Sequence, residues 1–237
     1  MRVLAVSPHL DDAAFSAGGV LAALAGAGHD VTVATCFTAT VPDPCGFALA
    51  CQTDKGLGPD VDYMALRRGE DTAAMSVLGA RLLHLPLPEA PHRGYASAPE
   101  LFGPMRPGDA VWQDLAGELA TLDADLLLAP QGLGAHVDHR QAVRAVALLD
   151  RPTAWWRDAP YVLRDPQAQP SEDLPGELKE LRLAQDAVCR ADACACYASQ
   201  LGFQFGGESQ MRRALAGLDE PLLADDQAYQ VLTGAGR

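Results

Sequence analysis

The feature that most constrains the fold is the alternation of short apolar runs with longer helical segments from residue 2 to residue 157. Residues 2–6 (RVLAV) are typical of a buried strand. Residues 12–27 carry apolar side chains at helical spacing and stop at Gly28, and residues 30–37 alternate and are rich in β-branched side chains. A strand, a helix and a strand joined by short connections predict a parallel sheet with helices on its faces.

The same alternation continues along the chain and gives three more strands and three more helices. Segments 38–63 and 86–108 are rich in proline and glycine, so we expect two long loops, which in a compact domain often line a binding site. The predicted helices and strands of this part, followed by a helical region, are 64–79 (helix), 81–85 (strand), 109–122 (helix), 125–130 (strand), 138–150 (helix), 153–157 (strand) and 174–216 with its tail (helical).

These elements predict a Rossmann-like α/β fold, with a mostly parallel sheet flanked by helices. We expect one domain over residues 1–237, made of an α/β core over residues 1–165 and a mainly helical C-terminal part over residues 166–237. An alternative is a nucleotide-binding α/β domain. Residues 18–19 are two glycines, but no GxGxxG or GxxxxGK[ST] loop follows the first strand, so that alternative lacks its phosphate-binding loop.

The charge balance bears on the partners. Asp and Glu number 31 against 18 Lys and Arg, which gives a net charge of -13. Proteins that bind phosphate backbones or anionic membranes usually carry a basic excess, so we expect neither partner, although the charge of one cleft can differ from the net charge of the protein.

The sequence also predicts a location. The first apolar run begins at once without a charged leader, and no run of 18 apolar residues occurs, so we expect a cytoplasmic protein without a signal peptide or membrane span.

The six cysteines are expected to be free thiols, as in a reducing compartment. Cys45 and Cys51 share a predicted loop, and the sequence leaves open whether they pair. Cys194 and Cys196 form a CxC sequence without a second pair at the spacing of a zinc ribbon, so they are not predicted to bind metal.

Two clusters of histidine and aspartate follow predicted strands. Residues 7–12 (SPHLDD) follow the first strand, and residues 131–139 (QGLGAHVDH) follow the fourth. In open α/β sheets, sites lie at the carboxyl ends of the strands. A catalytic zinc takes about three protein ligands and leaves one position for water, and a further carboxylate can serve as general base. The two clusters together therefore predict an open metal site.

Each cluster also has a purely structural interpretation. Asp12 and Asp138 stand where they could cap the helices that follow, and His9 could be a hydrogen-bonded structural histidine. His84 lies inside an apolar strand and is expected to be a core histidine with its hydrogen bonds satisfied. The metal hypothesis rests on the combination of both clusters at one edge of one sheet.

The two clusters resemble the metal motifs of the LmbE-like deacetylases, which include the PIG-L type enzymes acting on N-acetylglucosaminyl conjugates. Residues 9–13 (HLDDA) resemble the family's His-Pro-Asp-Asp-Glu motif, and residues 136–139 (HVDH) its His-x-Asp-His motif. Residues 67–70 (RRGE) resemble its Arg-x-x-Glu helix, and residues 197–200 (YASQ) a Tyr-x-Ser-Gln segment. The leucine and alanine in HLDDA depart from the usual proline and glutamate, which leaves the substrate open.

The resemblance implies a role for each motif residue. It implies a zinc ion, which does not exclude another divalent metal such as Fe²⁺. The implied residues are the metal ligands His9, Asp12 and His139, the base Asp11 that activates metal-bound water, His136 at the oxyanion or leaving amine, Asp138 orienting a neighbouring histidine, and Arg67 (or else Arg68) binding substrate.

Arg93, in the second proline-rich loop, is a further candidate from its own sequence context. An arginine beside a cleft can bind a substrate phosphate or carboxylate, and the alternative is a solvated loop charge.

The expected activity is removal of the N-acetyl group from an N-acetylglucosamine-type conjugate, with a small N-acetylated amino sugar as the partner. The alternatives are a related zinc hydrolase that cleaves a different amide and a non-catalytic protein that holds a metal. Release of acetate distinguishes the first from the others. The sequence leaves the oligomeric state open, a homo-oligomer included.

Overall fold

The computed structural model describes residues 1–234 and contains one seven-stranded sheet in the order β3-β2-β1-β4-β5-β7-β6. The first five strands are parallel, whereas β7 runs antiparallel to both β5 and β6. The predicted mostly parallel sheet is thereby confirmed. The strands are β1 Arg2–Ser7, β2 Asp30–Thr35, β3 Arg81–His84, β4 Leu126–Pro130, β5 Thr153–Trp156, β6 Lys179–Leu181 and β7 Leu222–Ala224.

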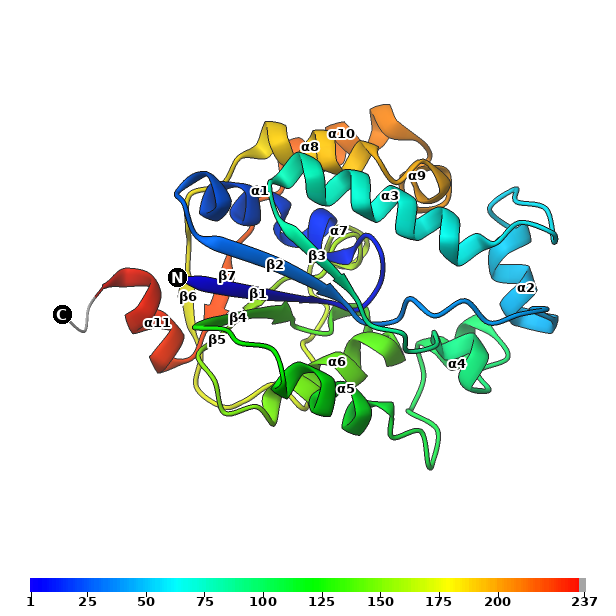
Figure 1. Cartoon of the computed structure of the whole chain (residues 1–237), viewed down its shortest axis with the longest axis horizontal. Coiled ribbons are helices and arrows are strands. Elements are labelled where there is room, and N and C mark those ends of the chain that lie inside the picture. The colour runs from blue at the N-terminus through cyan, green and yellow to red at the C-terminus, as the bar shows by residue number, and fades with distance from the viewer. Residues whose placement is uncertain (235–237) are drawn as a thin grey trace.

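Helices cover both faces of the sheet (Figure 1). Strand β1 shows why: alternate side chains of a strand point to opposite faces, and Val3 packs into one apolar cluster while Leu4 packs into the other. The first cluster joins the sheet to the layer of α1, α3, α8, α9 and α10, and the second to α5 and α6. These helices are α1 Asp12–Gly26, α3 Tyr63–Leu78, α5 Val111–Ala120, α6 Val137–Ala147, α8 Ala187–Ala195, α9 Ala198–Phe205 and α10 Glu208–Ala216.

The two predicted loops contain short helices of their own. In Figure 1 the arrowheads of β1, β2 and β3 point to the side of the molecule on which α2 and α4 lie, so both loops gather near the carboxyl edge of the sheet. The remaining helices are α2 Gly46–Thr53, the 3-10 helix η1 Ala90–Arg93, α4 Ala98–Leu101, the 3-10 helix η2 Leu133–Ala135, α7 Tyr161–Arg164 and α11 Asp226–Thr233. Among the described residues, no helix is long and apolar enough to cross a membrane.

The prediction of helix over residues 174–216 and the tail is wrong in two places, where β6 and β7 form instead. Each of these strands has only three residues, too few for an alternating pattern to show in the sequence. They form because β5 offers an unpaired edge, to which β7 hydrogen-bonds. The sheet therefore extends across the expected boundary at residue 165.

A buried ion pair fastens the C-terminal layer to α1. Helix α1 is kinked at Ala17 (φ -141°, ψ 15°), and the backbone N–H groups of Gly19 and Val20 donate to the Glu220 carboxylate at 3.0 and 2.7 Å. Arg190 from α8 lies 3.0 Å from the same carboxylate. A Cβ on Gly19 would meet Glu220 Oε1 at 2.8 Å, so the glycine there is needed for close approach of the carboxylate.

We expect Glu220→Ala to lower the free energy of unfolding by about 3–5 kcal/mol, because it leaves the Arg190 guanidinium buried without its counter-charge. Urea denaturation measures the loss. The control is Asp226→Ala, which breaks the exposed pair with Lys179 and should change the free energy of unfolding by less than about 0.5 kcal/mol. Equal losses in the two variants would show that the buried ion pair contributes no more to the free energy of unfolding than the exposed one.

Candidate metal centre

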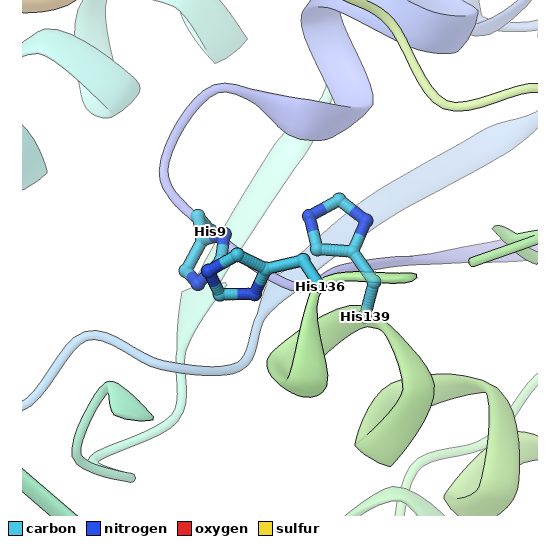
Figure 2. A group of neighbouring side chains, drawn as sticks. All are labelled: His9, His136 and His139. Carbon is cyan, nitrogen blue, oxygen red and sulfur yellow. The ribbon is translucent and has the colours of Figure 1, made fainter. Parts of the chain in front are cut away.

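The carboxyl ends of three neighbouring strands bring the polar side chains of the site together. His9 and Asp12 follow β1, His136 and His139 stand on either side of the start of α6 after β4, and Asp158 follows β5. Figure 2 shows the three histidine rings gathered at this edge, with His9 on the loop after β1 and the other two beside the first turn of α6. One ligand atom from each of the three histidines lies within 4.8 Å of the others.

Three potential ligand atoms converge on a still smaller space. Asp12 Oδ2 lies 3.2 Å from His9 Nδ1 and 3.1 Å from His139 Nε2. All three side chains are at most 14% exposed. Asp12 does not cap α1 with its side chain, since the residue at the cap position is Asp11 and no side-chain cap forms there. The structure therefore turns the Asp12 carboxylate toward the two imidazoles.

Two further carboxylates hold the opposite edges of these imidazoles. His9 Nε2 lies 2.9 Å from Asp138 Oδ2, and His139 Nδ1 lies 2.6 Å from Asp158 Oδ1. Each ring thus has one nitrogen bonded to a carboxylate, which leaves the other nitrogen directed at Asp12. Carboxylates in this position fix the tautomer and orientation of metal-binding histidines in known sites.

The electrostatics of this cluster fit a divalent cation. His139 Nε2 is buried and makes no hydrogen bond to any described residue, a state that is costly for a polar atom unless something binds it. Burial alone would lower the pKa of His139, but the Asp12 and Asp158 carboxylates outweigh it and raise the pKa to about 9. A cluster that draws a proton onto a buried imidazole in this way has negative charge in excess, which a divalent cation would offset.

Asp11 is a buried carboxylate of the site that makes no recorded hydrogen bond to these histidines. Its side chain is 5% exposed and accepts no hydrogen bond from the residues the structure describes; the nearest cation is Arg67, whose Nη2 lies 4.0 Å away. Burial, followed by repulsion from Asp12, raises the pKa of Asp11 to about 7. A carboxylate with such a pKa can both accept and release a proton near neutral pH.

His136 is held as a neutral hydrogen-bond donor. Its Nδ1 accepts a hydrogen bond from the backbone N–H of Asp138 at 3.2 Å, so the side chain caps the N-terminus of α6. In the neutral ring the proton therefore sits on Nε2. Burial, with the positive charge of His9, lowers the pKa of His136 to about 3. The cap comes from this histidine, and not from Asp138 as the structural interpretation of the sequence had it.

The two candidate substrate arginines have different surroundings. Arg67 lies on α3, makes an ion pair with Glu89, and has a buried Nε without a hydrogen-bond partner among the described residues. Together with its 4.0 Å approach to Asp11, this places Arg67 beside the reacting groups. Arg93 is instead bonded to Asp138 and to Asp109. Arg68 donates to the Thr38 carbonyl and is turned toward the loop over 38–63.

Asp158 is the residue that the sequence analysis missed. It follows β5 at the carboxyl edge of the sheet, so the rule that singled out residues 7–12 and 131–139 would also have found it. A single aspartate forms no recognisable motif, however, so nothing in the sequence distinguished Asp158 from other aspartates. Besides holding His139, its Oδ2 accepts the backbone N–H of Leu133 at 3.0 Å, which fixes the turn that leads to α6.

The structure also shows the surroundings of a histidine, two tryptophans and the cysteines outside the cluster. His84 bonds to Asp71 at 2.9 Å, as expected of a satisfied histidine. Trp155 and Trp156, both on β5, are buried within the apolar clusters, so both belong to the core. All six cysteines, which lie among the described residues, are free thiols in this structure.

The Arg-x-x-Glu and Tyr-x-Ser-Gln segments, far apart in the sequence, meet in the fold. Glu70 accepts hydrogen bonds from the backbone N–H and the hydroxyl of Ser199 at 2.8 and 2.7 Å. Tyr197 donates to Asp71 at 2.7 Å. Both contacts tie α3, which carries Arg67, to the C-terminal layer.

The long loops line two hollows. One, of about 590 Å³, is lined by residues of the segment 38–63 together with Met64 and His92. The other, of about 740 Å³, is lined by Phe102, Ala135 and Arg140 among others. The Phe102 ring, 44% exposed, packs edge-on against His136 with the ring centres 5.3 Å apart. Phe102 therefore connects the second hollow to His136.

Comparison with known proteins identifies the family. The family described as GlcNAc-PI de-N-acetylase, or PIG-L, matches residues 4–149, which is more than half of the chain. The chain belongs to the PIG-L family. The resemblance seen in the HLDDA and HVDH motifs is thereby confirmed.

Named relatives of this PIG-L family member are deacetylases. It is 34% identical over 169 residues to the 2'-N-acetylparomamine deacetylase of Streptomyces fradiae, a match that covers 68% of this chain and 57% of that protein. It is 36% identical over 148 residues to a 1D-myo-inositol 2-acetamido-2-deoxy-alpha-D-glucopyranoside deacetylase of Corynebacterium glutamicum, covering 60% of this chain and 50% of that one. The chain thus matches only about half the length of these curated relatives.

A solved structure agrees over nearly the whole chain. The zinc-inhibited form of a teicoplanin deacetylase superposes with a TM-score of 0.76 at 26% identity, covering 95% of this chain and 99% of that one. The fold of this chain, including its C-terminal layer, is therefore similar to that of a solved deacetylase.

The Asp158 contact gives a testable prediction. Asp158→Asn should weaken zinc binding by about 10–100-fold, because the amide no longer fixes the His139 ring with its free nitrogen toward Asp12. Competition with a chromophoric chelator measures the affinity. The matched control is Asp165→Asn, an exposed position farther along the same connection, which should leave it unchanged. Equal affinities for Asp158→Asn and the wild type would mean that His139 is held in place by packing alone.

Proposed function

We propose that this protein is a metal-dependent hydrolase that removes the N-acetyl group from an N-acetylated amino sugar or its conjugate. The observation that carries the proposal is the convergence of His9 Nδ1, Asp12 Oδ2 and His139 Nε2 beside the Asp11 carboxylate, which accepts no hydrogen bond from the described residues. Membership of the PIG-L family and the activities in the names of its relatives support the same reaction.

The proposed metal ligands are His9, Asp12 and His139. These are the three side chains whose potential ligand atoms face one another, whereas the Nδ1 of His136 accepts a backbone N–H and its other nitrogen carries the proton. A set of two imidazoles and one carboxylate leaves a coordination position open, as catalytic zinc sites do. A divalent metal bound there supplies a Lewis acid that polarises a carbonyl and lowers the pKa of water. We propose zinc as that metal.

The remaining residues take the proton transfers and the developing charge. Asp11 removes a proton from the attacking water while the water oxygen bonds to the acetamide carbon. His136 donates its Nε2–H to the carbonyl oxygen as negative charge develops there. The C–N bond then breaks, the proton passes from Asp11 to the leaving nitrogen, and the products are acetate and the free amine. Arg67, close to Asp11, is proposed to contact the substrate.

The test is acetate release by purified protein supplied with up to one equivalent of Zn²⁺. The substrates to try first are 2'-N-acetylparomamine and N-acetylglucosaminyl-inositol, because relatives are named for them. Zinc is not added in excess, since a structure of a related enzyme is described as zinc-inhibited. We expect acetate and free amine in equal amounts, loss of both after chelation with EDTA, and recovery when zinc returns.

Two other outcomes would overturn the proposal. Release of an amine without acetate from other N-acyl sugars would indicate a hydrolase of a different amide. Stoichiometric zinc binding without turnover of any N-acyl sugar would indicate a binding protein that holds a metal.

A further inference from the structure

Asp138 is the residue through which a distant loop reaches the site. Its side chain is fully buried, and three donors surround it. His9 Nε2 lies 2.9 Å from Oδ2, the backbone N–H of Ala90 donates to the same oxygen at 3.1 Å, and Arg93 Nη2 donates to Oδ1 at 2.7 Å. Two of these three donors come from η1, in the proline-rich segment 86–108.

Four of the five N–H groups of the Arg93 guanidinium donate to described residues, which leaves one N–H on Nη1 without a recorded acceptor. Its Nε and Nη2 donate to the two oxygens of Asp109, each at 3.1 Å, and its Nη1 donates to the Pro88 carbonyl at 2.7 Å. Asp109 is itself fixed by the Tyr95 hydroxyl at 2.9 Å. The side chain of Arg93 is only 9% exposed, and the guanidinium lies over the Phe37 ring, 5.0 Å from its centre.

We propose that Arg93 is a positioning residue that sets metal affinity through Asp138 and His9. A carboxylate held at both oxygens cannot rotate, so it keeps the Nε2 edge of His9 fixed and the Nδ1 edge directed toward Asp12. The proline-rich loop is thereby a structural part of the metal centre as well as a lining of the substrate hollow. This inference rests on the metal-dependent function proposed above.

The shape of the guanidinium is essential to this role. Arg93 spans two carboxylates and a carbonyl with a rigid planar fork, which a lysine ammonium on a flexible stem cannot reproduce. Arg93→Lys keeps the charge opposite Asp138 but loses the bidentate contact with Asp109. Arg93→Met removes both. The two variants therefore separate the charge from the geometry.

The experiment measures Zn²⁺ affinity by chelator competition and the visible absorption of the Co²⁺-loaded protein. We expect Arg93→Met to weaken Zn²⁺ binding by about 10–100-fold and to alter the Co²⁺ spectrum, with Arg93→Lys in between. Where acetate release is measurable, kcat should fall while KM changes little. The control is Arg106→Met in the same loop, whose exposed side chain pairs with Glu100 and should leave both metal readouts unchanged.

A second variant distinguishes loss of the Arg93 contact from misfolding of the loop. Asp109→Asn leaves the Arg93–Asp138 contact in place and weakens only the support of Arg93, so it should shift Zn²⁺ affinity in the same direction by a smaller factor. Wild-type Zn²⁺ affinity in both Arg93→Met and Asp109→Asn would overturn the inference. So would a raised KM with unchanged metal binding, which would make Arg93 a substrate-binding residue.

The metal titrations need no substrate. Absence of acetate release from the wild type would refute the proposed activity, whereas the Zn²⁺ affinities of the Arg93 and Asp109 variants would still test the positioning role.

Discussion

Asp11→Asn should lower the rate of acetate release by about 10²–10⁴-fold while the protein keeps its full metal content. The substitution removes the proton acceptor and the charge that faces Arg67 at 4.0 Å, and it breaks no hydrogen bond to the described residues. Its pKa, raised to about 7 by burial and by Asp12, suits a base that must take up and return a proton in each turnover. Initial rates and elemental mass spectrometry measure the two quantities.

The matched control for this variant is Asp12→Asn at the adjacent position. Asp12 faces His9 and His139, so its substitution should lose metal and activity together. Asp11→Asn should unfold at or above the wild-type temperature, since it breaks no recorded hydrogen bond and removes a charge whose burial raises the pKa of Asp11. An Asp11→Asn protein that keeps full activity would assign the base elsewhere, and one that loses its metal would place Asp11 among the ligands.

His139→Ala should abolish metal binding and reduce acetate release to the level of the chelated wild type. It removes the buried Nε2 that has no hydrogen-bond partner among residues 1–234. His136→Ala should keep the metal and lose about 10²–10³-fold in kcat, because it removes the donor to the developing oxyanion, together with the side-chain cap of α6, and leaves the proposed ligands in place. The pair decides between the ligand set proposed here and one made of the three histidines that lie together in Figure 2.

His139→Gln provides a check on folding, because it fills more of the space and can still donate to Asp158. Circular dichroism of the three variants should match that of the wild type. The two His139 variants should unfold at the temperature of the metal-free wild type, and His136→Ala should unfold below the metal-loaded wild type because it loses the cap of α6. Retention of one zinc per chain in His139→Ala would contradict the proposed ligands, and loss of zinc in His136→Ala would favour the three-histidine set.

Much of the α/β core could be predicted because its signals are local. The apolar run over 2–6, the helical spacing over 12–27 and the alternation over 30–37 each lie within one element, and each element formed within a few residues of the expected bounds. The short helices inside the two long loops, and the three-residue strands β6 and β7, escaped prediction because elements of that length carry almost no periodicity.

The C-terminal strands show how the tertiary structure decides what local sequence leaves open. Residues 222–224 form a strand because the edge of β5 stands beside them with unpaired backbone groups. Glu220, nearby, takes its place because the kink in α1 leaves the N–H groups of Gly19 and Val20 to be satisfied. Neither condition is visible in the residues 217–225 themselves.

Local sequence specified the five parallel strands, the strand ends at which the chemistry lies, and the residue types present there: His9 and the adjacent aspartates after the first strand, and HVDH after the fourth. Which of these side chains are hydrogen-bonded to one another depends on the tertiary structure. It paired His9 with Asp138, brought Asp158 to His139, and turned Arg93 toward Asp138. The reason is physical: periodicity and motif spacing are fixed along the chain, whereas the partner of a buried charge is set by distance between elements that packing brings together.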